Sequence, residues 1–123
     1  MPGPAQLVIH SLRDVTVVNF EDTAILDTLQ VEQIGEALYE LVDGKACRKI
    51  ILDFTKVQLL SSSALGILIT LLKKSSEIKG RVVLCSLRPE LRKIFKISRL
   101  DKMFEFADNE EEALETFGVT TAG

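Results

Sequence analysis

Side chains that could hold a metal or a cofactor are scarce in this sequence. Its 123 residues include one His, two Cys and no Trp. Two cysteines are too few for a disulfide framework, and one His and two Cys do not make a metal-ligand cluster. We therefore expect no metal, no bound cofactor and two free thiols, at Cys47 and Cys85. A single His is more often structural than catalytic, so His10 is assigned no role.

Long apolar runs are missing as well. No stretch approaches the roughly 18 apolar residues of a membrane span, and the first residues, MPGPAQ, lack the basic and apolar regions of a signal peptide. We expect a cytoplasmic protein without membrane contact. Hydrophobic residues make up 46% and charged residues 27%, values near globular averages that predict one domain over residues 1–123. Residues 1–4 and 118–123 are predicted to be loose ends.

The rest of the chain is organised around the segment KIILDFTKVQLLSSSALGILITLLKK, residues 49–74. Its first apolar run is typical of a strand covered on both faces, and this strand ends at Asp53. The apolar spacing then becomes helical, which places Ser61, Ser62 and Ser63 at a helix N-terminus. One serine is expected to cap the helix. Loops after strand C-termini carry function in open α/β sheets, so a second hydroxyl is expected to face a partner.

The same segment resembles the signature of STAS domains, the anti-sigma factor antagonist family. In that family a hydrophobic strand ends in Asp, a Val follows, and an Asp-Ser-Ser-Gly-Leu-Gly run opens a helix. The matching positions are Asp53, Val57, Ser62, Ser63, Leu65 and Gly66. Ser61 stands where the family usually has Asp, and Ala64 where it usually has Gly. A partner kinase phosphorylates the first serine after that Asp, so the resemblance assigns phosphorylation to Ser62.

A second stretch, AILDTLQVEQIGEALYELV, resembles the family segment in which a Leu-Asp pair leads into the first helix. This resemblance aligns Asp27 with the family's Asp. It implies an acidic loop beside the phosphorylated serine and a partner surface formed by Asp27, Ser61, Ser62 and Ser63. The residues alone leave a simpler interpretation open, in which Asp27 or Thr28 only caps the helix.

The order of the predicted elements indicates an α/β fold. We expect a STAS-like mixed β-sheet of about five strands packed with about four helices. The predicted strands cover residues 6–12, 15–20, 50–52, 81–87 and 103–106, with a hairpin turn at Arg13-Asp14. The predicted helices begin near Thr28, Ala64, Pro89 and Asp108, with Gly80 as a C-cap and Asp108 and Glu111 as a capping box.

Residues 88–102 carry six Lys and Arg residues in a chain with a net charge of −3. The isoelectric point of about 5.2 and the lack of an aromatic platform disfavour nucleic-acid binding. A charged helix face is usually only solvated, and contact with an acidic protein partner is favoured over nucleic acid.

Three functional hypotheses follow from these features. The first is a non-catalytic, bacterial regulator of transcription that binds a kinase-type anti-sigma factor and is switched by phosphorylation at Ser62. ATP would then belong to the partner. The second is a STAS-like interaction scaffold that is never phosphorylated, because Ser61 replaces the usual Asp. The third, an enzyme with Ser62 as nucleophile, is disfavoured because there is no G-x-S-x-G elbow.

Overall fold

A computed structural model of the chain describes residues 7–119. In chain order, the elements are β1 (Leu7–Leu12), β2 (Val15–Phe20), β3 (Ala24–Ile25), α1 (Thr28–Asp43), β4 (Lys49–Asp53), β5 (Leu59–Leu60), α2 (Ser62–Glu77), β6 (Arg81–Cys85), α3 (Pro89–Ile97), the 3-10 helix η1 (Leu100–Lys102), β7 (Glu105–Ala107) and α4 (Glu110–Thr116). The described residues therefore contain the four expected helices.

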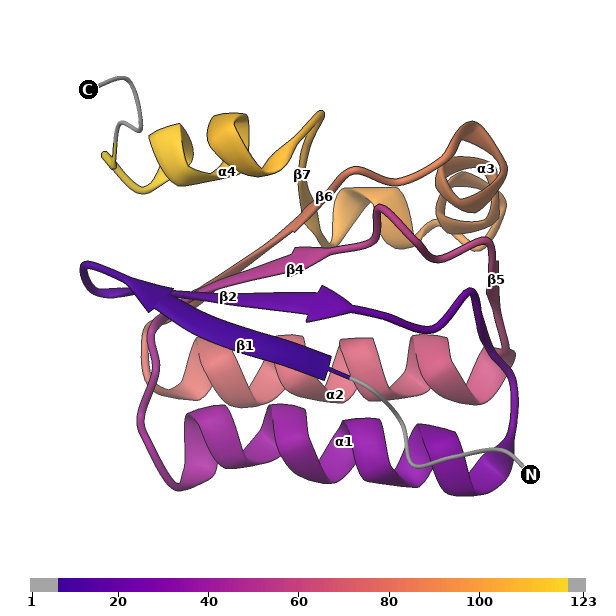
Figure 1. Ribbon diagram of the computed structural model, residues 1–123, viewed down its shortest axis with the longest axis horizontal. Coiled ribbons are helices and arrows are strands. Elements are labelled where there is room, and N and C mark those ends of the chain that lie inside the picture. The colour runs from indigo at the N-terminus through magenta and orange to yellow at the C-terminus, as the bar shows by residue number, and fades with distance from the viewer. Residues whose placement is uncertain (1–6, 120–123) are drawn as a thin grey trace.

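The main sheet has five strands in the order β1-β2-β4-β6-β7. β1 pairs with β2 in an antiparallel hairpin around the predicted turn at Arg13-Asp14, and the other neighbouring strands are parallel. The predicted mixed α/β sheet is confirmed. Helices α1 and α2 lie together on one face, and α4 lies on the other (Figure 1). A second, two-stranded sheet formed by β3 and β5 was not predicted.

The central strands are apolar along their whole length because both of their faces are covered. Ile50 and Leu52 of β4 point into the core beneath α1 and α2, whereas Ile51 packs in the smaller core beneath α4. The neighbouring strand β6 alternates in the same way, and none of these three β4 side chains is exposed to solvent. A continuous apolar run is the pattern expected of a strand buried on both sides.

Helices α1 and α2 pack tightly along their length. A Cβ added at Gly35 of α1 would lie 3.0 Å from Cδ1 of Ile67 on α2, so the two helices approach closely there. Near the other end, Lys74 of α2 donates a hydrogen bond of 2.9 Å to Asp43 of α1. Its Nζ also lies 5.3 Å from the ring centroid of Tyr39. One flank of α2 therefore packs against α1.

The end of α2 differs from the predicted cap. The helix ends at Glu77, and Lys79, not Gly80, adopts the left-handed conformation with φ of 60°. The N–H of Gly80 donates to the carbonyl of Ser75 at 2.7 Å. Gly80 is needed for a different reason, because a Cβ there would lie 2.8 Å from the backbone oxygen of Arg48.

The last two elements begin later than predicted. β7 covers Glu105–Ala107, not residues 103–106, because Ala107 still pairs with Cys85 of β6. The chain therefore leaves the sheet one residue later than expected. Asn109, not Asp108, caps α4, and its Oδ1 accepts a hydrogen bond of 2.8 Å from the N–H of Glu112. The predicted pairing of Asp108 with Glu111 is wrong by one position.

The predicted loose end at residues 118–123 does not begin where expected. Val119 is buried against the core beneath α4, and its N–H donates to the carbonyl of Leu114 at 3.0 Å. Residues 1–4 and 120–123 lie outside the described residues, so that part of the prediction is not tested. Likewise, strand β6 ends at Cys85, two residues before the predicted end.

Candidate partner-binding and phosphorylation site

The three serines occupy three different positions at the start of α2. Ser61 is the N-cap, with an extended backbone, and its Oγ accepts a hydrogen bond of 3.1 Å from the N–H of Ala64. Ser62 and Ser63 are the first two helical residues, and both are exposed. Neither hydroxyl forms a hydrogen bond with another described residue. One serine is therefore used for capping, and two hydroxyls remain available at the surface.

Asp27 is the N-cap of α1, as the simpler interpretation of the sequence proposed. Its Oδ2 accepts hydrogen bonds from the N–H groups of Leu29, at 3.1 Å, and Gln30, at 3.2 Å. The side chain of Gln30 accepts in return from the N–H of Asp27 at 3.4 Å, which completes a capping box. The Asp27 side chain is exposed at the helix terminus.

The short strands β3 and β5 bring the two helix starts together. They pair in parallel, with Ala24 opposite Leu59 and Ile25 opposite Leu60. The N–H of Ser61 also donates to the carbonyl of Ile25 at 3.0 Å. Because α1 and α2 follow directly after these two strands, the acidic cap and the serines lie at one edge of the domain. Sequence reasoning placed them together only through the family resemblance.

Exposed leucines surround this edge. Leu26 is 52% exposed, Leu29 is 60% exposed and Leu59 is 54% exposed. Leu26 directly precedes the Asp27 cap, Leu29 lies in the first turn of α1, and Leu59 belongs to β5. Three large apolar side chains at one end of two helices are typical of a surface that contacts another molecule. Their signal in the sequence is weak, because Leu29 simply falls outside the buried helical spacing.

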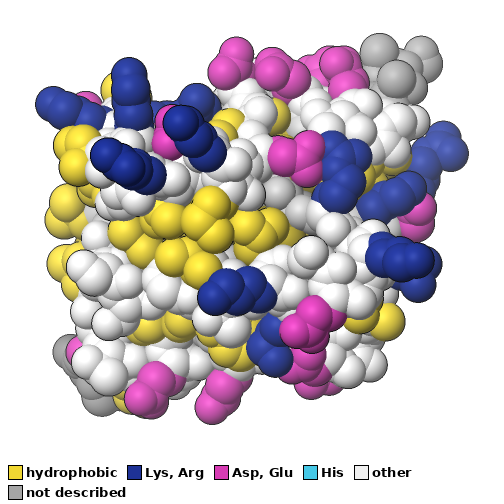
Figure 2. All heavy atoms as spheres, turned by 180° about the vertical axis from the view of Figure 1, so that it is seen from behind, with side chains coloured by type: hydrophobic (Ala, Val, Ile, Leu, Met, Phe, Trp, Pro, Cys, Tyr) yellow, Lys and Arg dark blue, Asp and Glu magenta, His cyan; other side chains and the backbone are white. Residues whose placement is uncertain are grey.

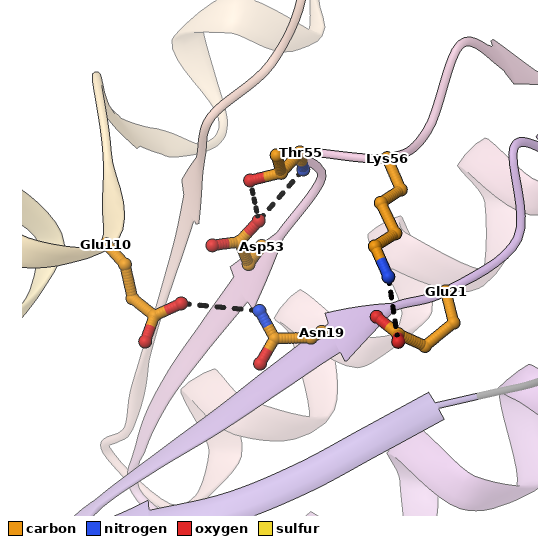
Figure 3. Close-up of polar contacts among 6 residues, drawn as sticks. All are labelled: Asn19, Glu21, Asp53, Thr55, Lys56 and Glu110. Carbon is orange, nitrogen blue, oxygen red and sulfur yellow. Dashed lines mark hydrogen bonds and ion pairs between the residues drawn. The ribbon is translucent and has the colours of Figure 1, made fainter.

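The loop that leads to the serines is held by Asp53 at the end of β4. Asp53 is only 5% exposed, and its Oδ1 accepts hydrogen bonds from both the N–H, at 2.8 Å, and the hydroxyl of Thr55. On the same loop, Lys56 forms an ion pair of 3.0 Å with Glu21, which follows β2 (Figure 3). Val57, two residues after Thr55, is completely buried. These contacts set where the chain re-enters the second sheet and begins α2.

Carboxyl groups meet on the α4 side of the same strand end. Glu110 accepts a hydrogen bond of 3.3 Å from the amide of Asn19 (Figure 3). Its Oε1 also lies 3.8 Å from Nε2 of His10. Burial, and then a hydrogen bond with Asp53, raise the pKa of Glu110 above its usual value. Burial also raises the pKa of the neighbouring Cys85 thiol to about 12. These groups lie on the face of the sheet that α4 covers, opposite α2.

The family assignment follows from a match that includes this whole arrangement. The model of the STAS domain family matches residues 6–113, which contain every element described above except the end of α4. This chain belongs to the STAS domain family.

Known relatives indicate which type of STAS domain this chain is. The Bordetella bronchiseptica protein BtrV, described as an anti-sigma factor antagonist, is 30% identical over 93 residues, which cover 76% of this chain and 79% of that protein. The solved anti-sigma factor antagonist domain of Planctomyces limnophilus is 25% identical with a TM-score of 0.81, over 93% of this chain and 98% of that one.

Bacillus SpoIIAA is similar in both of its solved forms. The phosphorylated form is 26% identical with a TM-score of 0.71, over 91% of this chain and 99% of that chain. The unphosphorylated form is 23% identical with a TM-score of 0.72, over 92% and 98% of the two chains. By homology, this STAS domain is of the anti-sigma factor antagonist type, a class of regulatory proteins that bind anti-sigma factors.

Other kinds of site find little support in the described residues. Between residues 7 and 119 no group of three or more His, Cys, Asp and Glu side chains could hold a metal ion. In the same range no helix is long and apolar enough to cross a bilayer. Cys47 and Cys85 are both free thiols. His10, the single His, contacts Glu110 instead of Ser62, so the described structure offers Ser62 no imidazole base.

Proposed function

We propose that this STAS domain is a non-catalytic regulator that binds a kinase-type anti-sigma factor through the edge containing Asp27, Ser61, Ser62 and Ser63. Phosphorylation of Ser62 by that partner would switch the interaction. The observation that carries the proposal is the division of roles at the start of α2. Ser61 uses its oxygen to cap the helix, whereas Ser62 has an exposed hydroxyl at the same edge as the Asp27 cap, without a hydrogen bond to another described residue.

Gly66 supports a close approach of a partner at this position. It lies one helical turn after Ser62 and is exposed, and a Cβ added there would meet nothing within 4 Å. Glycine inside a helix costs roughly 0.5–1 kcal/mol relative to alanine. The packing of the part of the chain that the structure describes does not require a glycine at this position. A partner backbone that lies directly against the first turns of α2 would explain the glycine, because a larger side chain there would keep the partner away.

A phosphate on Ser62 should change the surface without unfolding the domain. It adds roughly −1.5 to −2 charges at pH 7. At the helix N-terminus these charges meet free N–H groups and the positive end of the helix dipole. The same charges would stand among the exposed Leu26, Leu29 and Leu59, where they would oppose an apolar or acidic partner surface. The similarity to both forms of SpoIIAA supports a fold that tolerates phosphate.

The test separates folding, phosphorylation and binding. The partner is first identified by pull-down from the organism's own extract and then incubated with the protein and ATP, and the modified residue is mapped by mass spectrometry. We expect phosphate on Ser62 in the wild type and in Ser63→Ala, and none in Ser62→Ala. Ser62→Glu should keep the wild-type thermal melt and lose the partner. Phosphate on Ser61 or Ser63 in the wild type would show that the assignment to Ser62 is wrong.

A second candidate function is a STAS scaffold that binds its partner and is never phosphorylated. The observation in its favour is the residue at position 61. The family usually has Asp there, and this chain has Ser61, which supplies the cap without the negative charge. Incubation with the partner and ATP decides between the two candidates. A stable complex without phosphate on any of the three serines would favour the scaffold.

A further inference from the structure

One flank of α2 lies opposite the flank that meets α1. Ile67 and Lys74 mark the flank that meets α1. Leu65, Ile69 and Leu72 follow one another at i, i+4 and i+7, on the opposite flank. All three are only partly buried against the core. This flank of α2 is therefore apolar, and solvent reaches it.

The edge strand β7 places a further apolar side chain on the same side of the sheet as α2. Phe106 pairs in register with Leu84, whose side chain lies in the core beneath α1 and α2, so Phe106 points to the same side of the sheet. Its ring is partly buried and packs edge-on against Phe95 of α3, with a centroid distance of 5.6 Å. The guanidinium of Arg92 lies 4.3 Å from the same ring centroid.

Figure 2 shows this face of the molecule. Apolar side chains gather there in one continuous area, and Lys and Arg side chains stand along its border. We use the name apolar band for Leu65, Ile69, Leu72 and Phe106, the partly buried apolar residues of the outer flank of α2 and of β7.

Cations of α2 and of residues 88–102 that form no ion pair in the described part of the chain carry positive charge on the elements that flank the apolar band, and Arg92 contacts the Phe106 ring directly. Lys73 lies one turn after Ile69 on α2 and is exposed. The others belong to α3 and to the residues on either side of it; they are Arg88, Arg92, Lys93, Lys96, Arg99 and Lys102. None of these seven forms an ion pair with a carboxylate in residues 7–119, whereas Lys49, Lys56, Lys74 and Arg81 all do.

We propose that the apolar band is a docking surface for an acidic amphipathic helix of a partner protein. An amphipathic helix supplies both requirements, since its apolar face covers the leucines and the phenylalanine ring while its carboxylates meet the unpaired cations. A nucleic acid would satisfy the cations and leave the apolar residues without a partner. A second copy of this chain offers its acidic helix α4, but Ala113 and Leu114 of that helix are already buried.

The apolar band is separate from the phosphorylation proposal, although the two surfaces adjoin. Ser62 precedes Leu65 by three residues on α2. A partner bound at the serines could therefore extend along the same helix. Docking at the apolar band requires neither a kinase nor a phosphate, so the result for one proposal does not decide the other.

A synthetic peptide tests the proposal on the whole protein. The probe is an 18-residue helix with Leu at i, i+3, i+4 and i+7 positions and Glu elsewhere, titrated against ¹⁵N-labelled protein. We expect chemical-shift changes confined to α2, α3 and β7. The double variant Lys73→Glu, Lys96→Glu should weaken binding at least tenfold. The matched control, Arg13→Glu with Lys45→Glu, reverses two exposed charges at other loops and should bind within twofold of the wild type.

Several results would overturn the proposal. One is equal binding of a peptide in which Lys replaces every Glu, and another is equal binding of a peptide with the same composition and scrambled Leu positions. Tighter binding of duplex DNA or of phosphatidylglycerol vesicles than of the acidic peptide would assign the cations to a different partner. Sedimentation that shows a dimer, with the same shifts lost on dilution, would assign the apolar band to self-association. The dispersion of the NMR spectrum confirms that each variant is folded.

Discussion

Replacing Ser61 by alanine tests the division of roles among the serines most directly. The substitution removes the oxygen that accepts from the N–H of Ala64 at 3.1 Å. Ala64 is 5% exposed, so its N–H would have little access to water as a replacement partner. Loss of such an N-cap costs about 1 kcal/mol, within a range of roughly 0.5–2. For a domain of this size, 1 kcal/mol corresponds to a melting temperature lower by roughly 3–5 °C.

The neighbouring serines supply the matched controls. Ser62→Ala and Ser63→Ala remove exposed hydroxyls that form no hydrogen bond within residues 7–119, so each should change the free energy of unfolding by no more than about 0.5 kcal/mol. Ser61→Asp should keep the cap and add a favourable charge at the positive end of the dipole, worth roughly 0.3–1 kcal/mol.

Urea unfolding measured for all four variants gives the comparison, provided that the m-values agree. A Ser62→Ala variant as destabilised as Ser61→Ala would refute the reasoning, because it would place the cap at Ser62. The hydroxyl proposed for phosphorylation would then be the structural one. A Ser61→Asp variant less stable than Ser61→Ala would refute the electrostatic part of the argument alone.

Further predictions concern two glycines, one carboxyl group and the thiols. Gly80→Ala should lower the free energy of unfolding by roughly 1–3 kcal/mol in urea, since its Cβ would collide with a backbone oxygen, whereas Gly66→Ala should raise it by roughly 0.5–1 kcal/mol. If Gly66→Ala is destabilised, our account of that open position is incorrect. Because the folded pKa of Glu110 is raised above its usual 4.5, its contribution to stability is complete at lower pH and is lost as pH rises through the folded pKa. Glu110→Gln should therefore raise the melting temperature relative to wild type more at pH 7 than at pH 4, and an equal effect at both would contradict this assignment. In native protein at pH 8, an alkylating reagent should modify the half-buried Cys47 and leave Cys85 unmodified, because Cys85 is buried and its pKa is about 12. A measurement of intact mass should show the second adduct only after unfolding. Equal rates at the two thiols would argue against the burial of Cys85.

The long elements of the fold could be predicted because their patterns are locally unambiguous. The apolar run before Asp53 and the helical spacing after Ser63 both indicated their elements correctly. The last helix was harder, because both Asp108 and Asn109 are residues that cap helices. Pairing of β7 with β6 through Ala107 decided in favour of Asn109, and that pairing is not encoded in the local sequence.

The candidate site was predictable in part. The serines and Asp27 follow from the sequence pattern together with the family resemblance. The exposed leucines and the short strands β3 and β5 could not be found in that way, because two-residue strands have no periodicity to detect. Leucine at positions 26, 29 and 59 also looks no different in the sequence from leucine that enters a core.

The sequence by itself determined the α/β class, the four helices and the position of the serines at a helix start, because each depends on spacing between residues close in the chain. Only the tertiary structure decided which serine caps α2 and which hydroxyl stays free, because the cap depends on the backbone angle at which the chain leaves β5. It also decided that the outer flank of α2 and Phe106 of β7 stay only partly buried on the same side of the sheet. The exposure of these side chains depends on which strands and helices become neighbours. Those neighbours include residues about forty positions apart in the chain, which local sequence patterns do not relate.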